Sequence, residues 1–179
     1  MRKLTYERAC EAFSYDPNAG SITWRIKVST KVIAGRIAGG INKADGYRQI
    51  RIDDQLYRGH QIAWLLMVGT WPESLIDHIN GVRSDNRWEN LRSASNAINM
   101  QNRFKANVNN AAGLLGVSRK SNGQPFAQIM VAGKNIYLGS FDTPDLAHSA
   151  YLNAKKSHHP ECYFDAQGQA DRAKLEASA

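Results

Sequence analysis

A carboxylate, an imidazole and two amides occur together in one stretch of this chain. Asp77 and His78 are adjacent, and Asn90 and Asn99 follow within the next 22 residues. A carboxylate and an amide oxygen can hold a hard cation, and a neighbouring histidine can deprotonate water. Few chemistries need this set of side chains, and metal-assisted phosphodiester cleavage is one of them.

The available ligands favour one class of metal over another. Two oxygen ligands leave most of a coordination shell to water and phosphate, which suits Mg²⁺ or Mn²⁺ and does not suit structural zinc. The chain has two cysteines, Cys10 and Cys162, and no Cys-x-x-Cys pair. A cysteine-based zinc site is therefore excluded, and a disulfide scaffold is not indicated.

The elements around these residues must bring them together. The pattern predicts a strand over 75–79, a turn at Asn80-Gly81, a second extended piece from Asn90, and a helix that contains Asn96 and Asn99. Consecutive residues of a regular strand point to opposite faces. Asp77 and His78 can therefore share a site only if the strand is bulged or ends there.

The segment before this unit is expected to form its support. We predict a helix over 4–13, a turn over 15–20, a strand over 21–26, and strands 47–52 and 55–58 joined at Asp53-Asp54. An apolar helix follows over 60–68. His60 begins it, where a structural role is commoner than metal ligation, so we expect His60 to contact the ligating groups at most. We interpret Asn86 as a turn residue.

The second half of the chain has a different pattern. Residues 107–113 are small and polar, which is typical of a linker. Strands are predicted over 115–119, 126–131 and 136–141, followed by a helix capped by Thr143. The fold class is therefore α+β, with a three-stranded antiparallel sheet packed on one helix as the second unit. The predicted domains are 1–106, with a core at about 75–103, and 114–159, with a polar tail over 160–179.

The stretch from Asp77 to Arg92, with its approach over 56–64 and its continuation over 99–103, resembles the HNH endonucleases of phages and mobile introns. The resemblance implies a ββα-metal (His-Me finger) nuclease fold for the first unit. It places His78 as the general base and Asn90 as the residue that braces the loop and helps to orient that histidine. Asp77 and Asn99 stand at the metal-ligand positions. Separately, helix spacing places Asn96 near Asn99 on one face, which makes Asn96 the substitute ligand.

Residues 113–159 resemble the Apetala-two (ethylene-response-factor) DNA-binding domain. The resemblance rests on Gly116 to Lys120, on Ala127 to Ile129, and on the string from Gly133 to Pro144 that contains Tyr-Leu-Gly-x-Phe-Asp-Thr. It implies that the sheet lies in the major groove of DNA. The residues expected to contact DNA are Arg119, Lys120, Gln128, Lys134 and Tyr137.

Bulk properties agree with a nucleic-acid partner. The net charge is +7 and the pI is about 9.5, which favours a polyanion. The longest apolar run, 62–68, is too short to span a bilayer, and the N-terminus lacks a signal core, so we expect a cytoplasmic protein with no membrane contact.

The sequence therefore predicts a DNA endonuclease of the phage or homing type. We expect it to use one divalent metal, Mg²⁺ before Mn²⁺, and no small-molecule cofactor, and to act on double-stranded DNA as a monomer or a homodimer. Two alternatives stay open: a DNA-binding regulator that has lost cleavage, and a nuclease directed at RNA.

Overall fold

The structure is a computed structural model that describes residues 3–102, 106, 109–160 and 162. The chain divides into two compact units, residues 1–96 and 97–179. The predicted tail over 160–179 lies outside the described residues except for Pro160 and Cys162, and so do two residues of the predicted linker, 107 and 108. The domain limits that the sequence suggests stay predictions.

The first unit begins with a helix and a hairpin. Helix α1 (Tyr6–Ala12) is capped by Thr5 and is followed directly by β1 (Phe13–Asp16), which pairs antiparallel with β2 (Ser21–Trp24). The sequence predicted β2, but β1 was missed because its first residues were assigned to the helix and its last ones to the turn. The hairpin later proves important for the site.

The middle of the first unit is a small sheet and one buried helix. Strand β3 (Gly40–Ile41) pairs with β4 (Arg48–Ile52), which pairs with β5 (Gln55–Arg58). The predicted turn at Asp53-Asp54 is confirmed, since both residues adopt positive φ. Helix α2 (Gly59–Val68) follows at once and ends at Gly69 in the left-handed conformation, as predicted.

The core of the first unit lies between these elements. Apolar side chains from α1, the β1–β2 hairpin, the β4–β5 hairpin and α2 form one buried cluster. Burial of this apolar surface is the main source of stability for the unit. The largest fully buried apolar members are Phe13, Ile22, Ile50, Ile52, Ile62 and Leu65.

The site-bearing hairpin closes the first unit. Strand β6 (Leu75–His78) pairs antiparallel with β7 (Leu91–Ala94), and a single turn of 3-10 helix, η1 (Trp88–Asn90), leads into β7. Helix α3 (Asn96–Gln101) comes next in the chain. The predicted order of strand, loop, strand and helix is confirmed, and the fold is mixed α and β with small antiparallel sheets.

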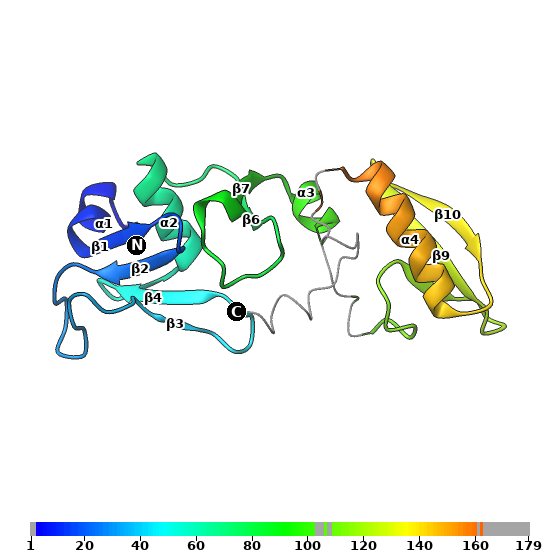
Figure 1. The fold of residues 1–179 in the computed structure, drawn as a ribbon, viewed down its shortest axis with the longest axis horizontal. Coiled ribbons are helices and arrows are strands. Elements are labelled where there is room, and N and C mark those ends of the chain that lie inside the picture. Colours follow the sequence, from blue (N-terminus) through cyan, green and yellow to red (C-terminus); the bar gives the residue numbers. More distant parts are fainter. Residues whose placement is uncertain (1–2, 103–105, 107–108, 161, 163–179) are drawn as a thin grey trace. The chain divides into compact units, whose positions relative to one another are not determined.

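The second unit is the predicted sheet and helix. Strand β9 (Pro125–Val131) is central, between β8 (Val117–Arg119) and β10 (Lys134–Ser140), and helix α4 (Pro144–His158) packs on the sheet (Figure 1). Its small core contains Val117, Ala127, Ile129, Ala147 and Tyr151. Among the described residues, no helix combines the length and the apolar character that crossing a bilayer requires.

Candidate active site

His78 is the last residue of β6, and the strand reaches it without a bulge. The ladder runs in regular register, with Asp77 opposite Arg92 and His78 opposite Leu91. Because the register is regular, the side chains of Asp77 and His78 leave the strand on opposite faces. The strand then ends, and the turn after it is closed by a hydrogen bond from the Gly81 amide to the His78 carbonyl of 2.8 Å. The sequence allowed either a bulge or the end of the strand at these residues, and in the structure the strand ends at His78.

Asp77 makes its described contacts across the hairpin. Its Oδ2 accepts hydrogen bonds from Nε and Nη2 of Arg92, at 3.1 and 2.9 Å. The Asp77 side chain is 7% exposed and that of Arg92 is 20% exposed. A guanidinium beside a buried carboxylate compensates much of the cost of burying that charge.

His78 lies in a buried cluster of rings. The ring of His60 stands edge-on to it with 5.0 Å between centroids, and the ring of Tyr47 is 5.8 Å away. Burial lowers the pKa of His78, and burial lowers the pKa of His60 to about 3. Both imidazoles are therefore neutral at neutral pH, and the neutral ring of His78 can accept a proton. His60 was expected to contact the ligating groups at most, and its position against the His78 ring agrees with that expectation.

Asn86 supplies the described side-chain hydrogen bond to the His78 ring. Its Oδ1 lies 3.1 Å from His78 Nε2, and the residue is 1% exposed. The local pattern indicates a turn residue at Asn86, and nothing in that pattern separates it from the other polar residues of the loop. Only the folded loop brings it to the ring.

Asn90 ties the two ends of the same loop together. Its Oδ1 accepts from the Asn80 amide at 2.9 Å, and its Nδ2 donates to the Asp85 carbonyl at 2.8 Å. Its own carbonyl accepts from the Ile79 amide at 2.9 Å. These bonds are those of a residue that braces a loop, and the direct side-chain contact to His78 comes from Asn86. The catalytic roles expected of His78 and Asn90 stay predictions.

Two arginines lie beside this cluster. The guanidinium carbons of Arg58 and Arg83 are 4.4 and 5.0 Å from the centroid of the Tyr47 ring. Asp45 holds both, because its Oδ2 is 2.6 Å from Arg58 Nη1 and its carbonyl accepts from Arg83 Nη1 at 2.9 Å. Asp45 thus holds Arg58 through its carboxylate and Arg83 through its backbone carbonyl, next to the two histidines. The local sequence pattern does not indicate a site role for either arginine.

The two metal ligands predicted from the sequence come from different units of the chain. Within the residues that the structure describes, no group of three or more His, Cys, Asp or Glu side chains is placed to hold a metal ion. Asp77 belongs to the first unit and Asn99 to the second, and Asn96 begins helix α3. The donor types still suit a hard cation, because a carboxylate and an amide both offer oxygen. Asp77 and Asn99 therefore remain predicted ligands.

The predicted DNA contacts of the second unit fall on two faces of its sheet. Gln128 is opposite Tyr137 on the face away from α4, and Lys120 Nζ is 5.7 Å from the Tyr137 ring centroid. Arg119 is opposite Pro125 and Lys134 is opposite Val131, so alternation assigns both to the helix side. The structure therefore groups Lys120, Gln128 and Tyr137 and separates Arg119 and Lys134 from them.

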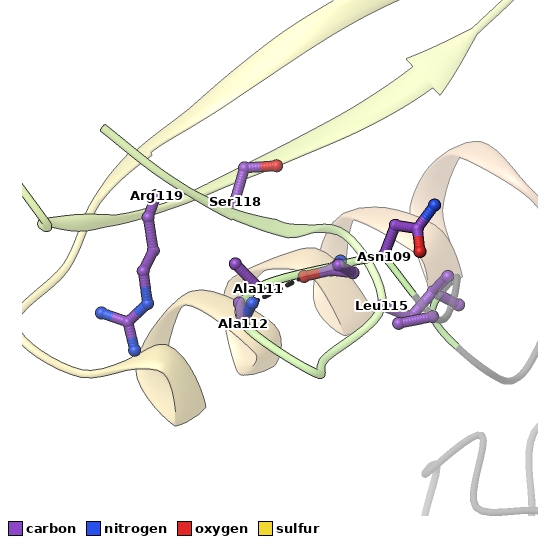
Figure 2. A pocket seen from close by; sticks show the side chains of 8 residues that line it. Asn109, Ala111, Ala112, Leu115, Ser118 and Arg119 are labelled. Atoms are coloured by element: carbon purple, nitrogen blue, oxygen red, sulfur yellow. Dashed lines mark hydrogen bonds between the residues drawn. The ribbon is translucent and has the colours of Figure 1, made fainter. Parts of the chain in front are cut away.

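Arg119 also borders a pocket of about 410 Å³ in the second unit (Figure 2). The remaining lining is small or apolar apart from asparagine and serine side chains. The guanidinium of Arg119 donates to the Gly123 carbonyl at 3.0 Å. Nothing in this lining resembles a catalytic set, so we assign the pocket no role. The lining residues are Ala106, Asn109, Asn110, Ala111, Ala112, Leu115, Ser118 and Arg119.

A comparison with known protein families finds a match in the segment around His78. Residues 57–101 match the family model described as HNH endonuclease. The matched segment starts in β5 and contains the β6–β7 hairpin with Asp77, His78, Asn86 and Asn90. The chain thus contains an HNH domain, which supports a nuclease that acts on DNA.

The match covers about a quarter of the 179 residues and does not reach the sheet of the second unit. No curated protein matches the chain, and no solved structure does either. The resemblance of residues 113–159 to the Apetala-two domain therefore rests on their sequence alone.

Proposed function

We propose that this protein is a metal-dependent DNA endonuclease that hydrolyses phosphodiester bonds with His78 as the general base. The observation that carries the proposal is the hydrogen bond between Asn86 Oδ1 and His78 Nε2 inside the HNH domain. An amide oxygen can only accept, so Nε2 carries the proton and Nδ1 has the basic lone pair. A neutral imidazole fixed in this form is suited to take a proton from water.

The reaction proceeds by attack of that water on the scissile phosphorus. His78 Nδ1 takes the proton, the new P–O bond forms, and the bond to the 3′ oxygen breaks. The leaving 3′ oxygen takes a proton from solvent water. The products carry 5′-phosphate and 3′-hydroxyl ends. When bound, a divalent metal, Mg²⁺ before Mn²⁺, supplies charge stabilisation at the phosphate, and Asp77 and Asn99 are the residues that would hold it.

Arg58 and Arg83 are the phosphate contacts that we propose for the first unit. They present two guanidinium groups against one aromatic ring beside His78, with only Asp45 as a described acidic partner. A guanidinium matches the geometry of phosphate oxygens and stays charged at every relevant pH. A polyanionic strand laid over His78 would therefore meet complementary charge.

Nicking of supercoiled plasmid tests the proposed activity. The purified full chain with Mg²⁺ is expected to convert supercoiled DNA to open-circular or linear DNA, and EDTA is expected to stop the conversion. No conversion with either Mg²⁺ or Mn²⁺ would favour the DNA-binding regulator. Faster cleavage of structured RNA than of duplex DNA would favour the RNA-directed nuclease.

We further propose that the second unit binds duplex DNA through the sheet face that carries Lys120, Gln128 and Tyr137. Gln128 can pair with adenine in the major groove, and Lys120 beside Tyr137 can neutralise a phosphate. The basic composition of the chain and its resemblance to the Apetala-two domain support this use. A phage or mobile-element origin, with a homing-type target, follows from the same resemblance and is part of the proposal.

The salt dependence of binding tests whether this face of the sheet contacts DNA. Lys120→Gln is expected to weaken duplex binding and to reduce the slope of log K against log salt by about 0.9, the value for one lost phosphate contact. The control is Lys156→Gln, which removes the same charge from the exposed side of α4. If Lys120→Gln and Lys156→Gln give the same slope of log K against log salt, the sheet face that carries Lys120 does not contact phosphate.

A further inference from the structure

The side-chain amide of Asn86 is buried and makes one described hydrogen bond. Its Oδ1 faces His78 Nε2 at 3.1 Å, and its Nδ2 has no hydrogen-bond partner in the part of the chain that the structure describes. A buried amide that served only packing would gain nothing from its polarity, because an unpaired buried donor costs free energy. The contact to His78 is what accounts for an asparagine at this position.

The backbone of Asn86 is held by a part of the chain that is distant in sequence. The Tyr15 hydroxyl donates to the Asn86 carbonyl at 2.7 Å. Two residues further on, the Trp88 amide donates to the Pro17 carbonyl at 2.9 Å. Both contacts come from β1 and the turn after it. Burial raises the pKa of Tyr15 to about 12, so its hydroxyl keeps its proton and stays a donor.

Glycines on both sides let the loop approach this closely. Gly20, at the end of the β1–β2 turn, has φ of +67°, and a Cβ there would lie 2.6 Å from the carbonyl carbon of Asn86. Gly59, the first residue of α2, faces the amide, and a Cβ there would lie 2.9 Å from Asn86 Nδ2. Asn86 is thus enclosed between the hairpin turn and the start of α2, with little space to move.

The hairpin is not part of the matched HNH segment, which begins at residue 57. We propose that the β1–β2 hairpin is a positioning element of the nuclease site: through Tyr15, Pro17 and Gly20 it fixes the 80–90 loop so that Asn86 holds His78 in the form protonated at Nε2. The proposal rests on the proposed function of His78. Tyr15 and Asn86 act through His78 and touch no reacting atom.

Tyr15→Phe is the primary test, because it removes one hydroxyl and leaves the ring in place. We expect kcat for nicking to fall about tenfold, the lower end of what loss of a partner of an active-site group costs, with KM unchanged. The matched control is Tyr57→Phe, which also removes a hydroxyl bonded to a backbone group of the first unit, the Leu4 amide at 2.9 Å. Thermal unfolding of both variants separates a loss of stability from a loss of position.

The second readout is the protonation pattern of the His78 ring, from long-range ¹⁵N–¹H correlation spectra of the full chain at neutral pH. Wild-type and Tyr57→Phe proteins are expected to show one form, protonated at Nε2. Tyr15→Phe and Asn86→Leu are expected to show a mixture of forms, and Asn86→Leu to lose about 10–100-fold in kcat.

The spectra decide the positioning role even if the chain cleaves no DNA. Retention of the Nε2 form in both folded variants would overturn the proposal, and so would a wild-type ring protonated at Nδ1. A mixture of forms in Tyr15→Phe but not in Tyr57→Phe supports it. Failure of the nuclease proposal alone would appear instead as an absence of nicking with the ring forms as expected.

Discussion

His78→Ala is expected to lower the rate of plasmid nicking by about 10²–10⁴-fold, the range that a general base contributes. The ring is 3% exposed, neutral at neutral pH, and held through Nε2 by Asn86. The described surroundings of His78 contain one further imidazole, His60, whose pKa of about 3 makes it a poor proton acceptor. His60 therefore cannot replace the lost imidazole.

Because His78 is buried, its removal also leaves a cavity, and a fold defect must be separated from a catalytic one. His78→Asn is the second variant, since it keeps a polar side chain without a basic nitrogen. His158→Ala is the control, because that histidine is exposed near the end of α4. If both His78 variants fold and nick at the wild-type rate, the general-base assignment is wrong.

Asp77→Asn is expected to lower nicking by about 100-fold or more at a fixed Mg²⁺ concentration, with partial recovery at higher Mg²⁺. Loss of a partner that merely supports a ligating group already costs about 10–100-fold, and loss of a ligand should cost more. The substitution keeps the shape of the side chain and an oxygen that can accept from Arg92. The measurement is the nicking rate as a function of Mg²⁺ concentration.

The competing explanation is that Asp77 serves only as the ion-pair partner of Arg92, whose Nη2 lies 2.9 Å from its Oδ2. Arg92→Lys is the matched variant, because it disturbs the same pair from the other side and leaves the carboxylate. A ligand role predicts that the half-saturating Mg²⁺ concentration rises for Asp77→Asn and not for Arg92→Lys. Equal losses without a change in metal dependence would assign Asp77 to structure.

Patterns between neighbouring residues accounted for most of the fold. Alternation predicted β2, β4 and β9, and the left-handed residues at Asp53-Asp54 agree with the predicted hairpin. Helix ends followed from Thr143 and Gly69. Two strands were not predicted: the two-residue β3, which lies in a glycine-rich segment, and β1. At β1 the chain passes from helix to strand without a residue that breaks either, so local propensity could not locate the change.

The sequence by itself determined which residues are available for chemistry in this protein: Asp77 next to His78, Asn90 and Asn99 after them, no cysteine pair for zinc, and an excess of positive charge. The order of strand, loop, strand and helix around them also follows from local pattern. These features depend on residue types and on short-range spacing, which a linear chain displays directly.

Only the tertiary structure decided which side chains surround His78. Asn86 reaches the ring because the loop folds back over the strand end, and Tyr15 reaches Asn86 from 71 residues away. Tyr47, Arg58 and Arg83 meet beside the same ring from separate segments. Likewise, strand register alone separated Arg119 and Lys134 from Gln128. Contacts of this kind depend on packing between segments far apart in sequence, and no local pattern encodes them.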